Sequence, residues 1–495
     1  MPSLLPYKSQ IHLRGKSLVQ EFDLVVIGGG PAGIAAATTA SNHNLDVLLI
    51  DERSTLGGQI YKRVGPGFEV KNSIKLGADY LRGEVLIKSL TKSNAEVILE
   101  TTVLSVEDSQ VIVVTADNKY ESIKYKKLLI TPGAYDRPVV FPGWTLPGVI
   151  TAGAAQSLVK TQRVLPGSRI FFAGSGPLAL AFPAQLSKMG ANIVGIIEAA
   201  PRPGLVKSFR IAKSLRGNLD LIRDAFFYQF HLVKSRIRIQ YGRIIVSANG
   251  TDRLESITYA RVDKNWRPIS GTEKTVPADT LCIGYGFFPS VELFKILNCE
   301  MSYDESRGGT VVQLDEWGST SLPNVFGAGD GTGVSGSYVA ILNGQIAALR
   351  IAYELDKISE KTLFSLSKSI RKEVNLRKKF QKAINHAYAV KSGIYQLASS
   401  ETIICRCESI PLKDLLPIIE STSDFSVVKA YSRCGMGLCQ GRNCQRQVSA
   451  LIAAKHGLDL GKIPGTTPRF PAKPVLLGQI ADSSIRDEKY FIDEQ

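Results

Sequence analysis

The chain has 495 residues, of which 44% are hydrophobic and 21% charged, and its formal net charge is +15. This length and composition predict two to four globular domains with an ample buried core. Cysteine is scarce and clustered, which excludes a disulfide framework and favours a reducing compartment. No run of about 18 apolar residues and no signal-peptide pattern occurs. We therefore expect a cytoplasmic protein with at most peripheral contact with the inner face of the membrane.

The positive charge is concentrated in two stretches. Residues 202–243 carry ten Lys/Arg against two Asp, and residues 368–382 carry seven against one Glu. We expect each stretch to be either a solvated face or a docking surface for an acidic partner subunit or a membrane. Neither stretch lies in a recognisable nucleic-acid-binding module, so no nucleic-acid partner is expected.

A dinucleotide-binding fingerprint follows the first apolar run. Residues 22–27, FDLVVI, lead directly into GGGPAG and an Ala-rich helix. Gly28 is expected to make the tight turn, Gly30 to let the backbone approach a pyrophosphate, and Gly33 to let the helix pack close to the strand. The helix N-terminus then presents free N–H groups to the phosphates. Strand, loop and helix in this order make the signal strong.

The next strand, VLLI, ends at two acidic residues. Asp51 lies 23 residues after Gly28, where a carboxylate can bind the ribose hydroxyl pair. Glu52 is the alternative for the same role.

Three further segments resemble those of flavoproteins with two dinucleotide-binding domains. LGGQIY follows the second strand, LLITPGAYDRP resembles the strand that returns the chain to the FAD domain, and LPNVFGAGDG resembles the segment that binds the flavin ribitol. The resemblance implies that FAD is the first cofactor. It implies FAD contacts from Gly58, Gln59, Thr131, Gly133, Gly329 and Asp330.

A second fingerprint, GxGxxA, lies in SRIFFAGSGPLALAFPAQ. Its residues are Gly174, Gly176 and Ala179, and the following strand ends at Glu198, which suits a ribose 2′-hydroxyl and hence NAD rather than NADP. Arg202, four residues later, is placed to meet a phosphate instead. The fingerprint specifies only an adenine-nucleotide half-site. An NAD site, an ATP or other adenine-nucleotide site, and a vestigial fold kept for packing therefore all stay open.

Disulfide reduction is not expected. Disulfide reductases of this architecture need a redox-active cysteine pair beside the flavin. Cys282 is predicted to be a buried strand residue, and Cys299 has no vicinal partner.

Four cysteines near the C-terminus are spaced C-x-C-x31-C-x4-C. Paired thiolates on two short loops are what a 2Fe–2S cluster needs. A four-thiolate zinc site, which usually shows C-x2-4-C pairs, and an incidental cluster are the alternatives. The predicted ligands are Cys405, Cys407, Cys439 and Cys444.

Three short helices are predicted around these cysteines. Leu412, Leu415 and Ile419 indicate the first, which Pro417 interrupts. The second is capped by Ser423 or Asp424. The third starts near Gly441 and ends near Gly457, with Cys444 in its first turn, where the helix dipole favours thiolate.

CRCE and VKAYSRCGMGLCQGRNC resemble the bacterioferritin-associated-ferredoxin-like module at the C-terminus of certain flavoproteins. Those are the alpha subunits of opine oxidase, the B subunit of hydrogen cyanide synthase, and the alpha subunits of D-hydroxyproline and related amino-acid dehydrogenases. The free-standing ferredoxin ends in C-x2-C, whereas this chain has C-x4-C. The departure leaves Cys434 as a substitute ligand.

The resemblance implies an electron-transfer subunit of a heteromeric amine or imino-acid dehydrogenase. A beta-type flavoprotein subunit would oxidise the substrate, and this chain would pass electrons from FAD through the cluster to a respiratory acceptor. No catalytic residue is evident in the sequence. An NADH-dependent reductase and a non-catalytic nucleotide-binding or iron–sulfur assembly subunit are the alternatives.

The expected fold class is α/β: an FAD Rossmann-like domain with an inserted NAD-type Rossmann-like domain, followed by a small helical iron–sulfur domain. The expected division is an N-terminal tail (1–19), an FAD domain in two parts (20–150 and 280–350), an inserted nucleotide domain (151–279), a basic helical connector (351–400), the iron–sulfur domain (401–460) and an extended tail (461–495).

Overall fold

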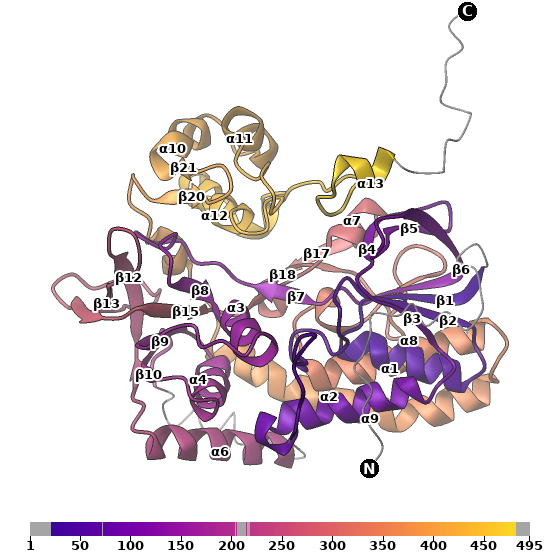
Figure 1. Ribbon diagram of the computed structural model, residues 1–495. Helices are drawn as coiled ribbons and strands as arrows, with labels where there is room; N and C mark the ends of the chain where they lie inside the picture. Colours follow the sequence, from indigo (N-terminus) through magenta and orange to yellow (C-terminus); the bar gives the residue numbers. More distant parts are fainter. Residues whose placement is uncertain (1–20, 72, 203, 205–213, 215–217, 482–495) are drawn as a thin grey trace, which may run out of the picture.

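The computed structural model describes residues 21–71, 73–202, 204, 214 and 218–481. The predicted N-terminal tail (1–19) and the end of the C-terminal tail lie outside these residues. The fold is mixed α/β, with two sheets that carry the two fingerprints and a small helical region at the C-terminal end (Figure 1). Within the described residues, no helix is both long enough and apolar enough to cross a bilayer.

The first sheet has seven strands. Its path is β3 (Glu96–Ile98), β2 (Val47–Ile50), β1 (Phe22–Ile27), β6 (Tyr120–Ile130), β5 (Gln110–Val114) and β4 (Thr102–Glu107), and β19 (Val325–Gly327) also pairs with β6. β1 is parallel to β2 and β6, whereas β4, β5 and β6 form an antiparallel meander. The central strand β1 is almost wholly buried because apolar layers cover both of its faces.

Two helices cover one face of this sheet. α1 (Pro31–Asn42) begins directly after the fingerprint and packs against α8 (Ser337–Glu354). Alanines dominate the contact, which lets the two helices approach closely. α2 (Ala78–Thr91) packs beside α1. α9 (Glu360–Ala387) packs against α8 and lies within residues 351–400, the predicted basic helical connector.

The second sheet is parallel throughout. Its order is β11 (Ile239–Tyr241), β10 (Ile193–Glu198), β9 (Ile170–Gly174), β15 (Thr280–Gly284) and β8 (Val149–Thr151). α3 (Ala152–Gln156), α4 (Leu178–Lys188) and α6 (Leu219–Lys234) share one apolar core with it. β15 extends this sheet to Gly284, five residues past the predicted boundary at 279. Cys282 lies in β15 and is fully buried, which confirms that expectation.

Smaller antiparallel sheets connect the parts. β12 (Arg243–Asn249), β13 (Ser256–Arg261) and β14 (Lys274–Pro277) form a three-stranded sheet. β7 (Ala134–Asp136) pairs with β16 (Phe287–Pro289), and β17 (Met301–Asp304) pairs with β18 (Gly309–Val312). The short helix α7 (Glu292–Ile296) follows β16.

The C-terminal region contains the three predicted helices, α10 (Leu412–Ser421), α11 (Phe425–Ser432) and α12 (Gln445–His456). The strand pair β20 (Ile403–Cys405) and β21 (Ile410–Pro411) precedes them, and α13 (Leu477–Ala481) follows. Asp424 caps α11 by accepting a hydrogen bond from the Ser426 amide at 2.7 Å. Gly457 ends α12 in the left-handed conformation, as expected. α12 starts at Gln445, so Cys444 is its N-cap rather than a first-turn residue.

Candidate functional site: a dinucleotide cavity beneath a cysteine cluster

A cavity of about 520 Å³ lies at the carboxyl ends of the first sheet's central strands. It is lined by ten of the eleven residues that the sequence assigns to FAD: Gly28, Gly30, Asp51, Glu52, Gly58, Gln59, Thr131, Gly133, Gly329 and Asp330. These residues come from four distant parts of the chain. Their convergence on one cavity is the geometry that a single extended ligand requires.

The eleventh residue, Gly33, has a packing role. A Cβ at Gly33 would lie 1.9 Å from the Gly28 carbonyl oxygen, so only glycine lets α1 approach the strand this closely. Gly30 differs, because a Cβ there would meet nothing closer than Gly58 Cα at 4.0 Å. The backbone of Gly30 is therefore bare toward the cavity, as an approaching pyrophosphate needs.

The three carboxylates assigned to FAD differ in environment. Asp51 is buried and accepts hydrogen bonds from the Gly29 amide at 2.5 Å and the Arg53 amide at 2.8 Å. Burial raises the pKa of Asp51 above its ordinary value. Glu52 is half-exposed and forms an ion pair with Lys473. Which of the two acids binds the ribose stays a prediction.

Asp330, the third carboxylate, accepts hydrogen bonds from the amides of Ser335 and Gly336, both at 2.9 Å. Burial raises its pKa as well. These bonds hold the 329–336 turn against the cavity and orient the side chain predicted for the ribitol. The bare glycine loop, the helix N-terminus and the carboxylates together fit a flavin dinucleotide.

A buried lysine that the sequence analysis missed contacts two residues of the cavity wall without lining the cavity itself. Lys62 donates hydrogen bonds to Gln59 Oε1 at 2.6 Å and Ser157 Oγ at 2.7 Å, and both partners line the cavity. Burial lowers the pKa of Lys62 to about 8, and the positive charges of Arg53 and Lys160 contribute to this shift. No motif marks Lys62, because its role comes from contacts with distant residues.

The second fingerprint loop is covered. Its strand and helix form as predicted, with Gly174 ending β9 and Ala179 buried in α4. The Tyr388 side chain lies over Gly176, with Cβ and Cγ only 3.5 and 3.7 Å from where a Gly176 Cβ would be. Tyr388 is therefore in van der Waals range of Gly176.

Glu198, the acidic residue of the second fingerprint, is hydrogen-bonded by backbone amides of its own loop. Glu198 is 2% exposed and accepts hydrogen bonds from the amides of Gly176 at 3.0 Å and Ala200 at 2.9 Å. Burial raises its pKa to about 7. Arg202 is exposed beyond the end of β10.

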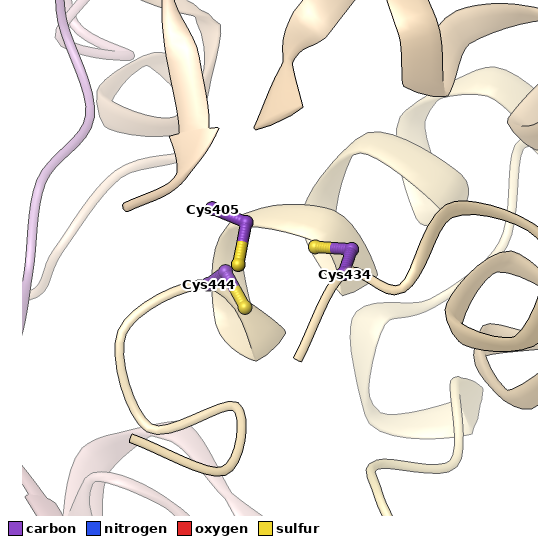
Figure 2. A group of neighbouring side chains, drawn as sticks. All are labelled: Cys405, Cys434 and Cys444. Atoms are coloured by element: carbon purple, nitrogen blue, oxygen red, sulfur yellow. The ribbon is translucent and has the colours of Figure 1, made fainter. Parts of the chain in front are cut away.

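The C-terminal cysteines form two groups. The sulfur atoms of Cys405, Cys434 and Cys444 lie within 4.8 Å of one another and are all buried. Figure 2 shows the three sulfurs turned toward a common centre, from β20, the end of α11 and the start of α12. Hydrogen bonds from the Cys434 and Cys444 thiols lower the pKa of Cys405. The thiolate form, which binds metal, is therefore favoured at Cys405, whereas the hydrogen bonds to Cys405 raise the pKa of both Cys434 and Cys444.

The other two predicted ligands, Cys407 and Cys439, make a side-chain hydrogen bond to each other. Cys407 is exposed and Cys439 half-buried. Gly437 packs on Cys407, since a Cβ on this glycine would lie 2.3 Å from Cys407 Cβ. The four predicted ligands therefore lie as two pairs, 405 with 444 and 407 with 439. Cys434, the substitute candidate, is a third sulfur beside the first pair.

The cysteine loop reaches the dinucleotide cavity directly. Arg442, between Cys439 and Cys444, lines the cavity and forms an ion pair with Glu292 at 2.9 Å. Its guanidinium also donates to the carbonyls of Cys439 and Ala472, both at 3.3 Å. Ala472 and Lys473, in the Pro-interrupted tail, line the cavity too. The C-terminal region therefore forms part of the cavity wall.

Comparison with known proteins agrees with this geometry. Residues 22–352 match the family model described as pyridine nucleotide-disulphide oxidoreductase, and residues 411–483 match the sarcosine oxidase A3 domain. The chain belongs to the pyridine nucleotide-disulphide oxidoreductase family. It is thus a flavin-dependent oxidoreductase, and its family membership implies that FAD binds in the cavity.

Relatives within this family match most of the chain. Hydrogen cyanide synthase subunit HcnB of Pseudomonas protegens is 31% identical, covering 91% of this chain and 96% of its own. An opine oxidase subunit from Agrobacterium tumefaciens is 29% identical, covering 93% and 91%. The crystal structure of L-proline dehydrogenase from P. horikoshii has the same fold, with a TM-score of 0.66, 21% identity, and coverage of 93% and 79%.

No cysteine pair that could form a redox-active disulphide lies beside this cavity in the described part of the chain. All seven cysteines lie in the described part of the chain, and none lines the cavity. Cys282 and Cys299 are buried in two different apolar cores.

Proposed function

We propose that this chain is the FAD- and 2Fe–2S-containing electron-transfer subunit of a heteromeric dehydrogenase for amines or imino acids such as opines, proline derivatives or glycine. Relatives at about 30% identity are named as subunits of opine oxidase and hydrogen cyanide synthase. A beta-type flavoprotein subunit is the proposed donor and a respiratory carrier the proposed acceptor. The cytoplasmic side of the membrane is the proposed location.

The observation that carries this proposal is the shared wall between the cavity and the cysteine loop. Arg442 is two residues from Cys444 in the sequence and also lines the cavity. An iron–sulfur centre at this loop would therefore adjoin the dinucleotide site. FAD, when bound, exchanges electron pairs with organic substrates and single electrons with such a centre.

The residues of the chain have defined tasks under this proposal. The Gly28–Gly33 loop would hold the pyrophosphate, and Asp330 would orient the ribitol. The Lys62 ammonium, held by Gln59 and Ser157, would place positive charge behind the cavity wall. A fixed positive charge favours a reduced, anionic cofactor electrostatically. Arg442, held by Glu292, would keep the cysteine loop against the cavity.

The proposed cluster ligands are Cys405, Cys407, Cys439 and Cys444. Cys407 and Cys439 form one sulfur pair, and Cys405 and Cys444 lie together with Cys434 in the other group, so each group offers the two thiolates that one iron of a 2Fe–2S cluster takes. Serine substitutions test it. We expect C439S and C444S to abolish the rhombic electron paramagnetic resonance signal after dithionite reduction, and C434S to retain it. Loss of the signal in C434S with retention in C439S would show that Cys434 is the ligand.

The covered second loop argues against the alternative of an NADH-dependent reductase. Tyr388 lies within van der Waals range of Gly176, the residue that a dinucleotide pyrophosphate would approach, so we propose that this site does not take NAD in this form of the protein. Anaerobic NADH is expected to leave the flavin spectrum unchanged. Bleaching by NADH would reverse the assigned direction of electron flow.

The decisive experiment measures substrate oxidation by this chain in complex with a beta-type subunit. The chain is co-expressed with a candidate beta-type subunit, purified under argon, and tested for flavin, iron and sulfide. Dye-linked assays then use opines, proline derivatives and glycine. We expect flavin and cluster in the complex, and dye reduction with at least one substrate only when the partner is present. Colourless protein, or a zinc-containing chain without sulfide, contradicts the proposal.

A further inference from the structure

Helix α6 presents an apolar face that no described residue covers. Ile222, Phe226, Phe230 and Val233 are spaced as one stripe along the helix and are 40, 67, 59 and 66% exposed. Phe227, at the edge of this stripe, is 54% exposed. The rings of Phe226 and Phe230 stack with centroids 6.4 Å apart. Three clustered exposed phenylalanines on one helix are uncommon on a surface that only meets water.

The opposite face of α6 is fully engaged with the body of the protein. Leu232 is 1% exposed in the core of the second sheet. Asp220 forms an ion pair with Arg377 of α9 at 3.0 Å, and Asp224 forms one with Arg82 of α2 at 2.9 Å. Both acidic residues of the helix therefore point inward and are neutralised there. The contact with Arg377 also brings the two basic stretches of the sequence together.

The rim of the apolar stripe is positively charged. Four exposed bases lie on or just after α6: Arg223 within the helix, Lys234 at its end, and Arg236 and Arg238 beyond it. Arg223 lies 3.5 Å from Asp224, whose carboxylate it shares with Arg82. The other three bases have no ion pair within 4.0 Å among the residues that the structure describes. An apolar stripe edged by four bases, three of which lack an ion pair with any described residue, is complementary to an anionic surface with an apolar interior.

We propose that the α6 face, defined as Ile222, Phe226, Phe227, Phe230 and Val233 with the bases Arg223, Lys234, Arg236 and Arg238, binds the surface of an anionic phospholipid bilayer. The helix would lie in the plane of the interface, with the phenylalanines between the headgroups and the bases at the phosphates. This inference rests on the proposed function, since it supplies the contact with a membrane-bound acceptor. α6 lies on the opposite edge of the molecule from α10 to α12, which leaves the cysteine-bearing side free for a protein partner (Figure 1).

Vesicle flotation of the purified complex tests the proposal. The probes are phosphatidylcholine vesicles with and without phosphatidylglycerol, at low and high salt. We expect flotation only with phosphatidylglycerol, and weakening by salt because surface charges are screened. F226S/F230S should weaken binding at least tenfold, and K234Q/R236Q/R238Q about 100-fold. The control variants L477S and K413Q/K455Q alter exposed residues of the C-terminal region and should bind as the parent does.

The outcomes separate this proposal from the proposed function. Circular dichroism and dye-linked turnover are measured on every variant, so loss of vesicle binding in a folded, active complex supports the assignment. No flotation of the parent complex with either vesicle overturns it. Release of the beta-type subunit by F226S/F230S would show that the face is a protein interface, and also overturns it. Vesicle binding without turnover on any amine would leave this surface standing and refute the proposed function instead.

Discussion

Asp51 and Glu198 occupy the same place in the two fingerprints. Each carboxylate is buried and accepts a hydrogen bond from a glycine amide of its own loop, Gly29 or Gly176. Each therefore stabilises the turn that presents backbone N–H groups to a nucleotide. The structural role survives in the second site although Tyr388 covers the loop. A buried acid at this position is thus evidence for the fold of the turn and not for an occupied site.

The raised pKa of Glu198 predicts a pH-dependent stability. Its pKa rises from the ordinary 4.5 to about 7 because burial disfavours the charged form. The folded state then binds more protons than the unfolded state between these values, so stability falls as pH rises through this window. The upper limit of the effect is about 3 kcal/mol.

The Glu198→Gln variant measures this effect. The glutamine side chain cannot ionise. The apparent Tm of the variant should therefore rise relative to that of the parent protein as the pH increases from 5 to 8. Thermal unfolding followed by circular dichroism at several pH values gives the difference. A constant difference across this range would show that Glu198 does not titrate on unfolding.

In helix α1 and the loop before it, different glycines serve folding and ligand binding. Gly33 is required for packing, because its Cβ would overlap the Gly28 carbonyl, whereas Gly30 faces the open cavity. Helix α4 carries Ala179 at the position equivalent to Gly33 and is accommodated there. The same fingerprint position can therefore demand glycine in one loop and accept alanine in the other, depending on how closely the helix approaches the strand.

Two glycine variants give opposite results under this interpretation. Gly33→Ala should destabilise the protein by about 2 kcal/mol or more and lower its FAD content, since backbone must move. Gly30→Ala should leave the apparent Tm of the apoprotein unchanged but weaken FAD binding more than tenfold. Differential scanning fluorimetry and flavin titration check both. Gly478→Ala, at a position with nothing within 4 Å, is the control. Equal destabilisation by both variants would contradict the division of roles.

The C-terminal region is joined to the rest of the molecule by one continuous apolar core. That core runs from Phe171 and Ile197 of the second sheet through Tyr395 to Cys405 and Cys444. A buried polar network reinforces the junction: Arg137 is bonded to Glu305 at 3.2 Å and to the Tyr395 hydroxyl at 2.5 Å, and Arg446 also pairs with Glu305. The cysteine-bearing helices are therefore part of the main body and not a freely attached module.

Truncation tests this integration. Ending the chain after Ser400 should remove more than a third of the shared core's buried residues and lower the apparent Tm by about 10 °C or more, or make the protein insoluble. Ending it after Val475 removes only α13 among the described elements and should be tolerated. Calorimetry of the full chain should show one cooperative transition for this body. Two separate transitions, with a stable 1–400 fragment, would show an independent C-terminal domain.

Local patterns in the sequence were sufficient for much of the fold. The apolar run before GGGPAG, the second fingerprint and the apolar spacing of Leu412, Leu415 and Ile419 predict their elements correctly, because strand and helix periodicity and glycine turns depend on neighbouring residues. The convergence of ten residues assigned to FAD on one cavity follows from short motifs too, while their contacts with FAD stay a prediction.

The sequence by itself determined the order of the two nucleotide folds, the motifs that line the first cavity and the cysteine-rich end of the chain. Only the tertiary structure decided that Tyr388 covers Gly176, that Cys434 joins Cys405 and Cys444, and that Lys473 pairs with Glu52 across 421 residues. The tertiary structure also decided that the two aspartates of α6 face the protein body and that its phenylalanines face outward. These contacts join segments whose separation in the chain carries no periodic signal, so packing of the whole molecule is required to specify them.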